Sequence, residues 1–129
     1  VQEIADALKG VEVPILIMDQ IGFLAALYRY AQFAYIGGGF GKGIHNILEA
    51  LIYKIPLCFG PNYKKFPEAI QCIEHGMAFA INSTDDFNEF IAKVSIQKNE
   101  NKTHFDAYFV ENLGASALIY SYLEENNLI

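Results

Sequence analysis

Five glycines lie within positions 37–43, and they are the first sign of a ligand site in this sequence. Glycine lets the backbone approach a ligand closely and turn its N–H groups toward it. The apolar run before the glycines predicts a strand, and the periodic apolar residues after them predict a helix that begins near Ile44. The start of such a helix offers unpaired N–H groups and the positive end of its dipole. We therefore expect a phosphate or carboxylate site here.

Three polar residues follow the glycines: His45, Asn46 and Glu49. A spacing of four would place His45 and Glu49 on one face of the expected helix, beside the glycine loop. A carboxylate in that place can accept hydrogen bonds from two hydroxyls, as when a protein holds a ribose. The alternative is that His45 caps the helix and Glu49 is solvated. The glycine loop and Asn46 favour the ligand site.

A second loop, over residues 59–66, also follows an expected strand and precedes an expected helix. It contains Gly60, Pro61 and Asn62, followed by two lysines. In parallel α/β sheets, ligands bind outside the carboxyl ends of the strands. We therefore expect both loops to open on one crevice. The alternative is a rigid Gly-Pro turn with two solvated lysines.

Standard nucleotide motifs do not fit the glycine loop. A Walker loop requires Ser or Thr after its lysine, but Lys42 is followed by Gly43. The dinucleotide fingerprint Gly-x-Gly-x-x-Gly has no register through Lys42 and Ile44. The chain also has no Asp-x-Asp motif and no cluster of His and Cys, so we expect no metal site.

Short apolar runs alternate with segments of helical periodicity, which is typical of parallel strands joined by crossover helices. The sequence thus predicts an α/β fold, a Rossmann-like parallel sheet with helices on both faces. The expected strands are Pro14 to Met18, Phe33 to Ile36, Pro56 to Phe59 and Met77 to Ile81. The expected helices cover residues 21–28, 44–51, 66–73 and 87–94, and a last helix runs from 103 to 125.

The length and composition limit the class of protein. With 129 residues the chain is long enough for one domain. Four strands make only part of a doubly wound domain, so we expect a fragment whose remaining strands precede Val1. The net charge of −6 argues against nucleic-acid binding. Lys42, Lys64 and Lys65 nevertheless follow expected strands, which predicts a positive edge able to hold an anion.

Two further features concern the cellular setting. Cys58 and Cys72 lie in apolar surroundings, which favours reduced, buried thiols over a disulfide. No apolar stretch approaches the roughly 20 residues of a membrane span. The first residues, Val1 to Lys9, lack the features of a signal peptide.

These motifs resemble the C-terminal domain of bacterial 3-deoxy-D-manno-octulosonic acid (Kdo) transferases. That family has Gly-Gly-Ser, a short loop, Gly-Gly-His-Asn-Pro-Leu-Glu-Pro-Ala, and then a strand ending in Phe-Gly-Pro. The corresponding segments here are Gly37 to Gly39, Gly43 to Ala50, and Phe59 to Pro61. Weaker similarity extends the resemblance over residues 19–115: Asp19, Gly22, Leu24 and Tyr28 upstream, and Asn112, Gly114 and Ala115 downstream.

The sequence departs from the family pattern at several positions. Gly39 replaces a serine, Ile44 replaces a glycine, and Ile47 and Ala50 replace the two prolines. Phe23 stands where Glu is common, so the resemblance supports no role for that acid here. None of these changes removes a polar side chain from the helix that follows the glycines.

The resemblance implies a GT-B glycosyltransferase that moves Kdo from CMP-Kdo to a lipid A precursor at the cytoplasmic side of the bacterial inner membrane. Residues 1–129 would be its C-terminal donor-nucleotide-binding domain. The acceptor site, the catalytic base and the membrane anchor would lie in an N-terminal domain outside this chain. No catalytic residue is assigned within the chain, and no metal or other cofactor is expected. The implied donor-binding residues are Gly38, Gly39, Lys42, Gly43, His45, Asn46, Glu49, Gly60, Pro61 and Asn62.

Two other functions fit the same residues. Another GT-B transferase or epimerase that uses a UDP-sugar would need the same loop and glutamate. A non-catalytic module that binds a nucleotide or phosphometabolite would explain the absence of an internal base. Competition between CMP and UDP distinguishes the first, and an assay of sugar transfer distinguishes the second.

Overall fold

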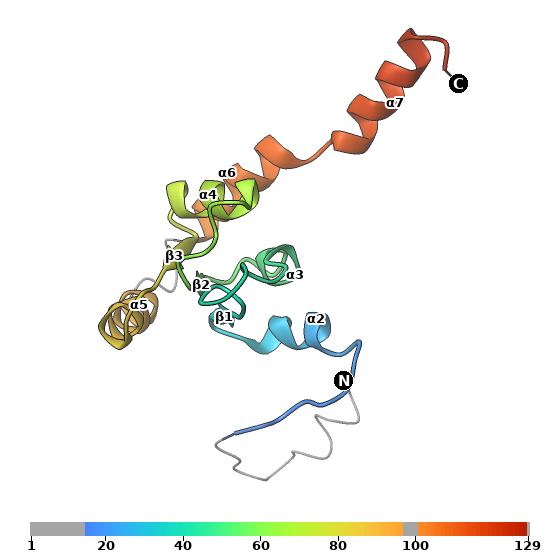
Figure 1. Ribbon diagram of the computed structural model, residues 1–129. Helices are drawn as coiled ribbons and strands as arrows, with labels where there is room; N and C mark the ends of the chain where they lie inside the picture. The colour runs from blue at the N-terminus through green and yellow to red at the C-terminus, as the bar shows by residue number, and fades with distance from the viewer. Residues whose placement is uncertain (1–14, 97–100, 129) are drawn as a thin grey trace.

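A computed structural model describes residues 15–96 and 101–128, with side chains from residue 104 onward in the second stretch. Its centre is a parallel sheet in the order β1-β2-β3 (Figure 1). The strands are β1 (Ala34–Ile36), β2 (Leu57–Phe59) and β3 (Ala78–Ala80). In register, Leu57 lies between Ala34 and Ala78. The predicted α/β class and parallel sheet are confirmed.

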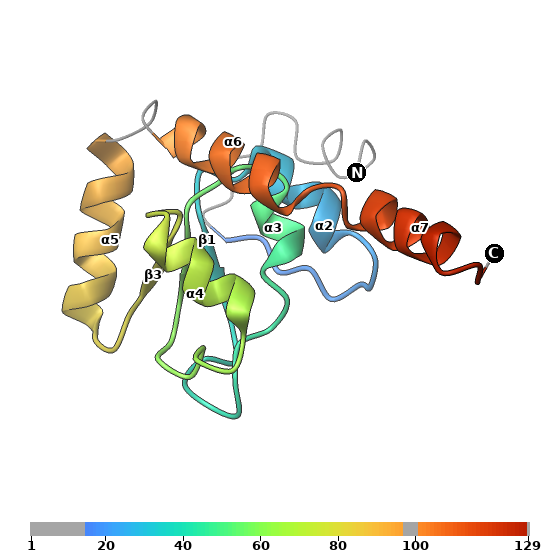
Figure 2. The same cartoon turned by 90° about the horizontal axis from the view of Figure 1, so that it is seen from above.

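Helices precede and follow each of these strands. They are α2 (Leu24–Leu27), a 3₁₀ turn η1 (Tyr28–Tyr30), α3 (Leu48–Leu51), α4 (Pro67–Glu74), α5 (Thr84–Ile96), α6 (Asn101–Asn112) and α7 (Ala115–Glu125). Figures 1 and 2 show α5 on one side of the sheet and α3, α4 and α6 on the other. The predicted covering of both faces is therefore confirmed.

The central strand β2 is buried on both faces because successive side chains point to opposite sides of a sheet. Leu57 and Phe59 belong to the larger core, which also contains Leu51 and Phe105. Cys58 belongs to a smaller core with Phe90 of α5. The rings of Phe33 and Phe79 pack around the Phe90 ring at centroid distances of 5.6 and 5.3 Å, the first nearly perpendicular and the second tilted.

Both cysteines are free and fully buried, as the sequence predicts. Burial raises the pKa of each thiol to about 12, and the charge of Glu68 adds to this effect at Cys72. Neutral thiols are poor nucleophiles and metal ligands. Cys58 and Cys72 are therefore core residues, and they contribute no chemistry to a site.

Local contacts fix the end of α4 and the start of α5. Gly76 closes α4 with a φ of +70°, which a side chain would disfavour. At the start of α5, Ser83 Oγ accepts a hydrogen bond from Asp86 N at 3.1 Å. Asp86 Oδ2 in turn accepts from Ser83 N at 3.1 Å and from Asn82 N at 2.7 Å. This reciprocal capping fixes the turn that joins β3 to α5.

The predicted strand over Pro14 to Met18 is wrong within the described residues. Pro14 lies outside them, and residues 15–18 form neither a strand nor a helix. Ile15, Leu16 and Ile17 are 77%, 47% and 82% exposed, so these apolar side chains are poorly covered by the described structure. An apolar run becomes a strand only with a hydrogen-bonded neighbour, and no pairing of β1 other than with β2 occurs in the part of the chain that the structure describes.

The predicted last helix is divided in two. Gly114 has a φ of +104°, so it ends α6 and begins α7 instead of continuing one helix. Phe105 and Tyr108 of α6 are buried, whereas Leu113, Ile119 and Tyr122 are exposed. Figures 1 and 2 both show α7 projecting beyond the body of the domain. None of the described helices is long and apolar enough to cross a membrane.

The docking of α6 gives a test of the core. Phe105→Ala should lower the free energy of unfolding by about 3–5 kcal/mol, because a fully buried ring leaves a cavity. Val110→Ala on the same helix, at a side chain 78% exposed, is the matched control and should have little effect. Urea denaturation measures both, and equal losses in the two variants would contradict the described packing.

Candidate functional site

The glycine loop, residues 37–43, folds back on itself after β1. Gly41 N and Gly43 N both donate to Gly38 O, at 2.8 and 3.3 Å. Gly38 has a φ of +87° and Gly43 a φ of +144°, conformations that other residues rarely adopt. A Cβ added to Gly38 would lie 2.3 Å from Gly43 O. These glycines are therefore required by the shape of the loop.

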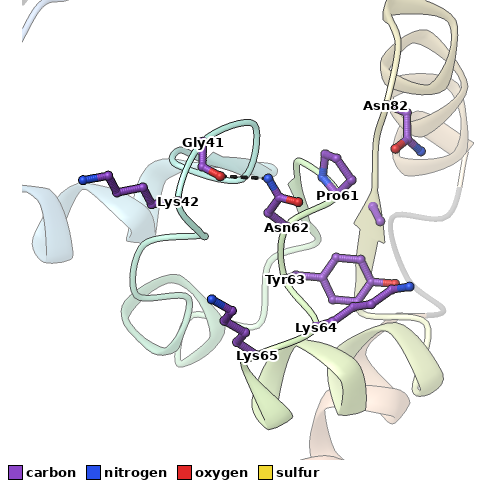
Figure 3. Close-up of a pocket in the computed structure, with 9 residues that line it drawn as sticks. Gly41, Lys42, Pro61, Asn62, Tyr63, Lys64, Lys65 and Asn82 are labelled. Carbon is purple, nitrogen blue, oxygen red and sulfur yellow. Dashed lines mark hydrogen bonds between the residues drawn. The ribbon is translucent and has the colours of Figure 1, made fainter.

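The glycine loop is held against the second loop, residues 60–66, by a contact between two glycines. A Cβ added to Gly39 would lie 2.5 Å from Gly60 N, and one added to Gly60 would lie 2.5 Å from Gly39 C. Asn62 N donates to Gly39 O at 2.9 Å. The Asn62 side chain also donates, through Nδ2, to Gly41 O at 2.8 Å (Figure 3). The two loops therefore form one unit.

One pocket lies between these loops and the end of β3, and we name it the basic pocket (Figure 3). In Figure 3, Lys65 points toward the space between the loops, Lys42 extends outward from the glycine loop, and Lys64 lies along Tyr63. The described residues that line it include three lysines and no Asp or Glu. The full set is Gly41, Lys42, Pro61, Asn62, Tyr63, Lys64, Lys65, Ala80 and Asn82.

A second pocket runs along β1 and α2, and we name it the edge pocket. Its polar residues are His45, Asn46 and Glu49, and its walls include Tyr28 and Tyr35. Asn46 Nδ2 donates to Glu49 Oε1 at 3.2 Å. Burial raises the pKa of Tyr28, and the negative charge of Glu49 raises it further. The described lining contains no lysine or arginine, in contrast to the basic pocket.

The predicted helix start near Ile44 is wrong. His45 N donates to Gly37 O at 3.0 Å, and Asn46 Oδ1 accepts from Leu48 N at 3.0 Å. These bonds compete with helical hydrogen bonding, so α3 begins only at Leu48 and has four residues. The one-face spacing argument for His45 and Glu49 therefore fails, since His45 precedes the helix. A helix of four residues also has only a small dipole, so it adds little to the anion site that the sequence predicts.

Both loops open on one pocket, the basic pocket, as the sequence predicts, but the polar residues that follow the glycines line the separate edge pocket. Lys42, Pro61 and Asn62 line the basic pocket, while His45, Asn46 and Glu49 line the edge pocket. The glycine loop contributes to both, through Gly41 and through Gly37 respectively. The four remaining predicted residues form the turn and the contact between loops: Gly38, Gly39, Gly43 and Gly60. Their binding of a ligand stays a prediction.

Sequence reasoning missed several lining residues. Asn82 lies just beyond the carboxyl end of β3, so the rule that ligands bind at that edge was a signal for it. Tyr63 adjoins the lysines of the second loop and packs on Phe59 at a centroid distance of 5.4 Å. Tyr28 and Tyr35 looked like core residues in the sequence. Tyr35 is nevertheless 46% exposed.

No group of three or more His, Cys, Asp or Glu able to hold a metal ion occurs among the described residues. The pockets have volumes of about 960 and 630 Å³, within the range of small-molecule sites. The positive charge of the basic pocket suits an anion, and the tyrosines and acceptors of the edge pocket suit a flat, hydroxyl-bearing group.

Known proteins share this sequence pattern. The chain is 41% identical over 61 residues to the 3-deoxy-D-manno-octulosonic acid transferase of Chlamydia pneumoniae, covering 46% of this chain and 14% of that protein. It is 30% identical over 122 residues to the enzyme of the same name from Haemophilus influenzae, covering 87% of this chain and 29% of that protein. The chain belongs to the Kdo transferase family. It spans less than a third of the length of these two relatives.

A solved structure has a similar fold. The C-terminal CMP-Kdo binding domain of WaaA from Acinetobacter baumannii superposes with a TM-score of 0.59 and 21% identity, covering 69% of this chain and 48% of that one. No family model matches the chain. In the Kdo transferase motif a serine stands at the position of Gly39, and the contact between loops leaves no room for its Cβ here.

The contact between loops can be tested by a pair of glycine substitutions. Gly39→Ala should lower the free energy of unfolding by about 1–3 kcal/mol, because its Cβ would overlap the Gly60 backbone. Gly41→Ala is the matched control, since its nearest contact is an ordinary 3.5 Å. Thermal denaturation and the amide NMR shifts of residues 60–62 report the effect. A Gly39→Ala protein as stable as Gly41→Ala would refute the contact.

Proposed function

We propose that this chain is the donor-nucleotide-binding domain of a GT-B Kdo transferase, which moves Kdo from CMP-Kdo to a lipid A precursor at the cytoplasmic side of the inner membrane. The observation that carries the proposal is the junction of the glycine loop with two pockets of different chemistry in a member of this family. The similar fold of a domain described as CMP-Kdo binding supports it.

In the edge pocket, Glu49 would accept hydrogen bonds from the ribose hydroxyls. Asn46 already donates to Glu49 Oε1, which orients the carboxylate, and an ionised carboxylate has capacity for further donors. The rings of Tyr28 and Tyr35 would form apolar walls beside the nucleoside. His45, whose ring lies against Gly37 and Gly38, would connect this pocket to the glycine loop.

The transfer step would take its catalytic base and acceptor site from a domain outside this chain. Asp86 is a poor candidate for a base, because a hydrogen bond from the Asn82 backbone, with further bonds from Ser83, lowers its pKa. Negative charge on the leaving CMP would be offset by loop amides and lysines, without a metal ion.

The nucleotide site can be tested on Glu49. CMP added to the chain should shift amide NMR signals within residues 38–49 and 60–65, and Glu49→Ala should weaken CMP binding about tenfold or more, the effect of losing hydrogen bonds to a charged group. Stability should change by no more than about 0.5 kcal/mol, since Glu49 is exposed. The control is Glu89→Ala, an exposed residue of α5.

Three results would contradict this assignment. CMP could produce no saturable shifts in these loops, UDP could bind more tightly than CMP, or Glu49→Ala could unfold the domain instead of weakening CMP binding. The second result would favour a UDP-sugar enzyme with the same fold.

The requirement for a separate acceptor domain can be tested by an assay of Kdo transfer. The 129-residue chain alone should transfer no Kdo from CMP-Kdo to a lipid A precursor, because one domain cannot orient both substrates. A protein extended by an upstream acceptor domain should do so in the presence of a chelator. Turnover by the chain alone, or loss of the extended protein's activity in chelator, would refute the respective part of the proposal.

A further inference from the structure

The distribution of charge between the two pockets is the feature that the proposed nucleotide site leaves unexplained. The chain is acidic overall, with nine Lys and Arg against 15 Asp and Glu. Three of these nine cations nevertheless line the basic pocket, where no acidic residue is found among the described lining. The edge pocket carries Glu49 and, in its described lining, no lysine or arginine. Such separation favours a ligand with a neutral part and a strongly anionic part.

The proposed donor has this character. A nucleotide-activated octulosonic acid carries one negative charge on the phosphodiester and a second on the carboxylate of its sugar acid. The phosphodiester lies between nucleoside and sugar, and the glycine loop contributes to both pockets, with Gly37 in one lining and Gly41 in the other. With the nucleoside in the edge pocket, the sugar acid is directed to the basic pocket.

Resting on the proposed function, we propose that the basic pocket is a carboxylate subsite for the sugar acid, with Lys65 as its central cation. Figure 3 shows Lys65 directed between the two loops, whereas Lys42 extends outward and Lys64 lies along Tyr63. Asn82 and Tyr63 add polar groups at the wall of the pocket.

Asn62 has a different role from the one its sequence position suggests. Both its backbone N–H and its side-chain amide donate to carbonyls of the glycine loop, at 2.9 and 2.8 Å. It is therefore a positioning residue, which keeps the loop that carries Lys42 opposite the loop that carries Lys65. The subsite depends on this bridge because lysine side chains are flexible and gain a fixed place only from the backbone that carries them.

The experiment compares CMP-Kdo with CMP as ligands of the 129-residue chain, by NMR titration with freshly prepared CMP-Kdo. CMP-Kdo should bind more tightly than CMP. Lys65→Gln should weaken CMP-Kdo binding about tenfold while leaving CMP binding nearly unchanged, since a charge-assisted contact is lost only from the sugar acid. Lys65→Arg should preserve most of the difference, and higher salt should reduce it.

The control is Lys93→Gln on α5, a lysine paired with Glu89 at 2.8 Å and absent from the lining of both pockets. It should bind both ligands as the unchanged chain does. If Lys65→Gln weakens the binding of CMP and CMP-Kdo equally, Lys65 contacts the phosphate. If it weakens the binding of neither, Lys65 is not part of the site. Either result overturns the carboxylate subsite. Failure of the unchanged chain to bind CMP or CMP-Kdo would instead overturn the proposed nucleotide function itself.

Discussion

The backbone contact between Gly39 and Gly60 is the constraint on which the candidate site depends. Two loops that follow different strands meet there without side chains between them. A Cβ on either residue would lie 2.5 Å from the backbone of the other, which is too close for the contact to persist. The hydrogen bonds from Asn62 to the carbonyls of Gly39 and Gly41 then close the junction. Lys42 and Lys65 consequently belong to one pocket although they lie on separate loops.

The sheet beneath this junction explains why the loops can be held so closely. Strand β2 is fully buried and pairs in register with both β1 and β3, so the loops after β1 and β2 leave the sheet at the same edge. Phe59, the last residue of β2, is buried and supports the ring of Tyr63 in the second loop. Phe66 lies under Gly43, where an added Cβ would be 3.0 Å from its ring. The core therefore fixes both ends of the second loop.

The two pockets of this small domain differ in charge. A lysine-lined pocket and a pocket with tyrosines and a glutamate share one glycine loop. Under the proposed function, this arrangement would order a donor that joins a nucleoside to a sugar acid along the glycine loop. It would also allow an acidic chain to bind an anion, because the local field of a few lysines at a loop edge outweighs the net charge at that distance.

The sequence by itself determined the parallel α/β class, the three inner strands, the buried thiols and the family, because buried strands and glycine-rich loops leave strong local patterns. It failed where competing contacts decide the outcome. Local hydrogen bonds at His45 and Asn46 delay α3 to Leu48, Gly114 divides the last helix, and residues 15–18 have no paired neighbour. Only the tertiary structure assigned His45 and Lys42 to different pockets and showed that Asn62 forms hydrogen bonds between the loops. These relations depend on distances between segments that follow separate strands and meet only in the folded chain.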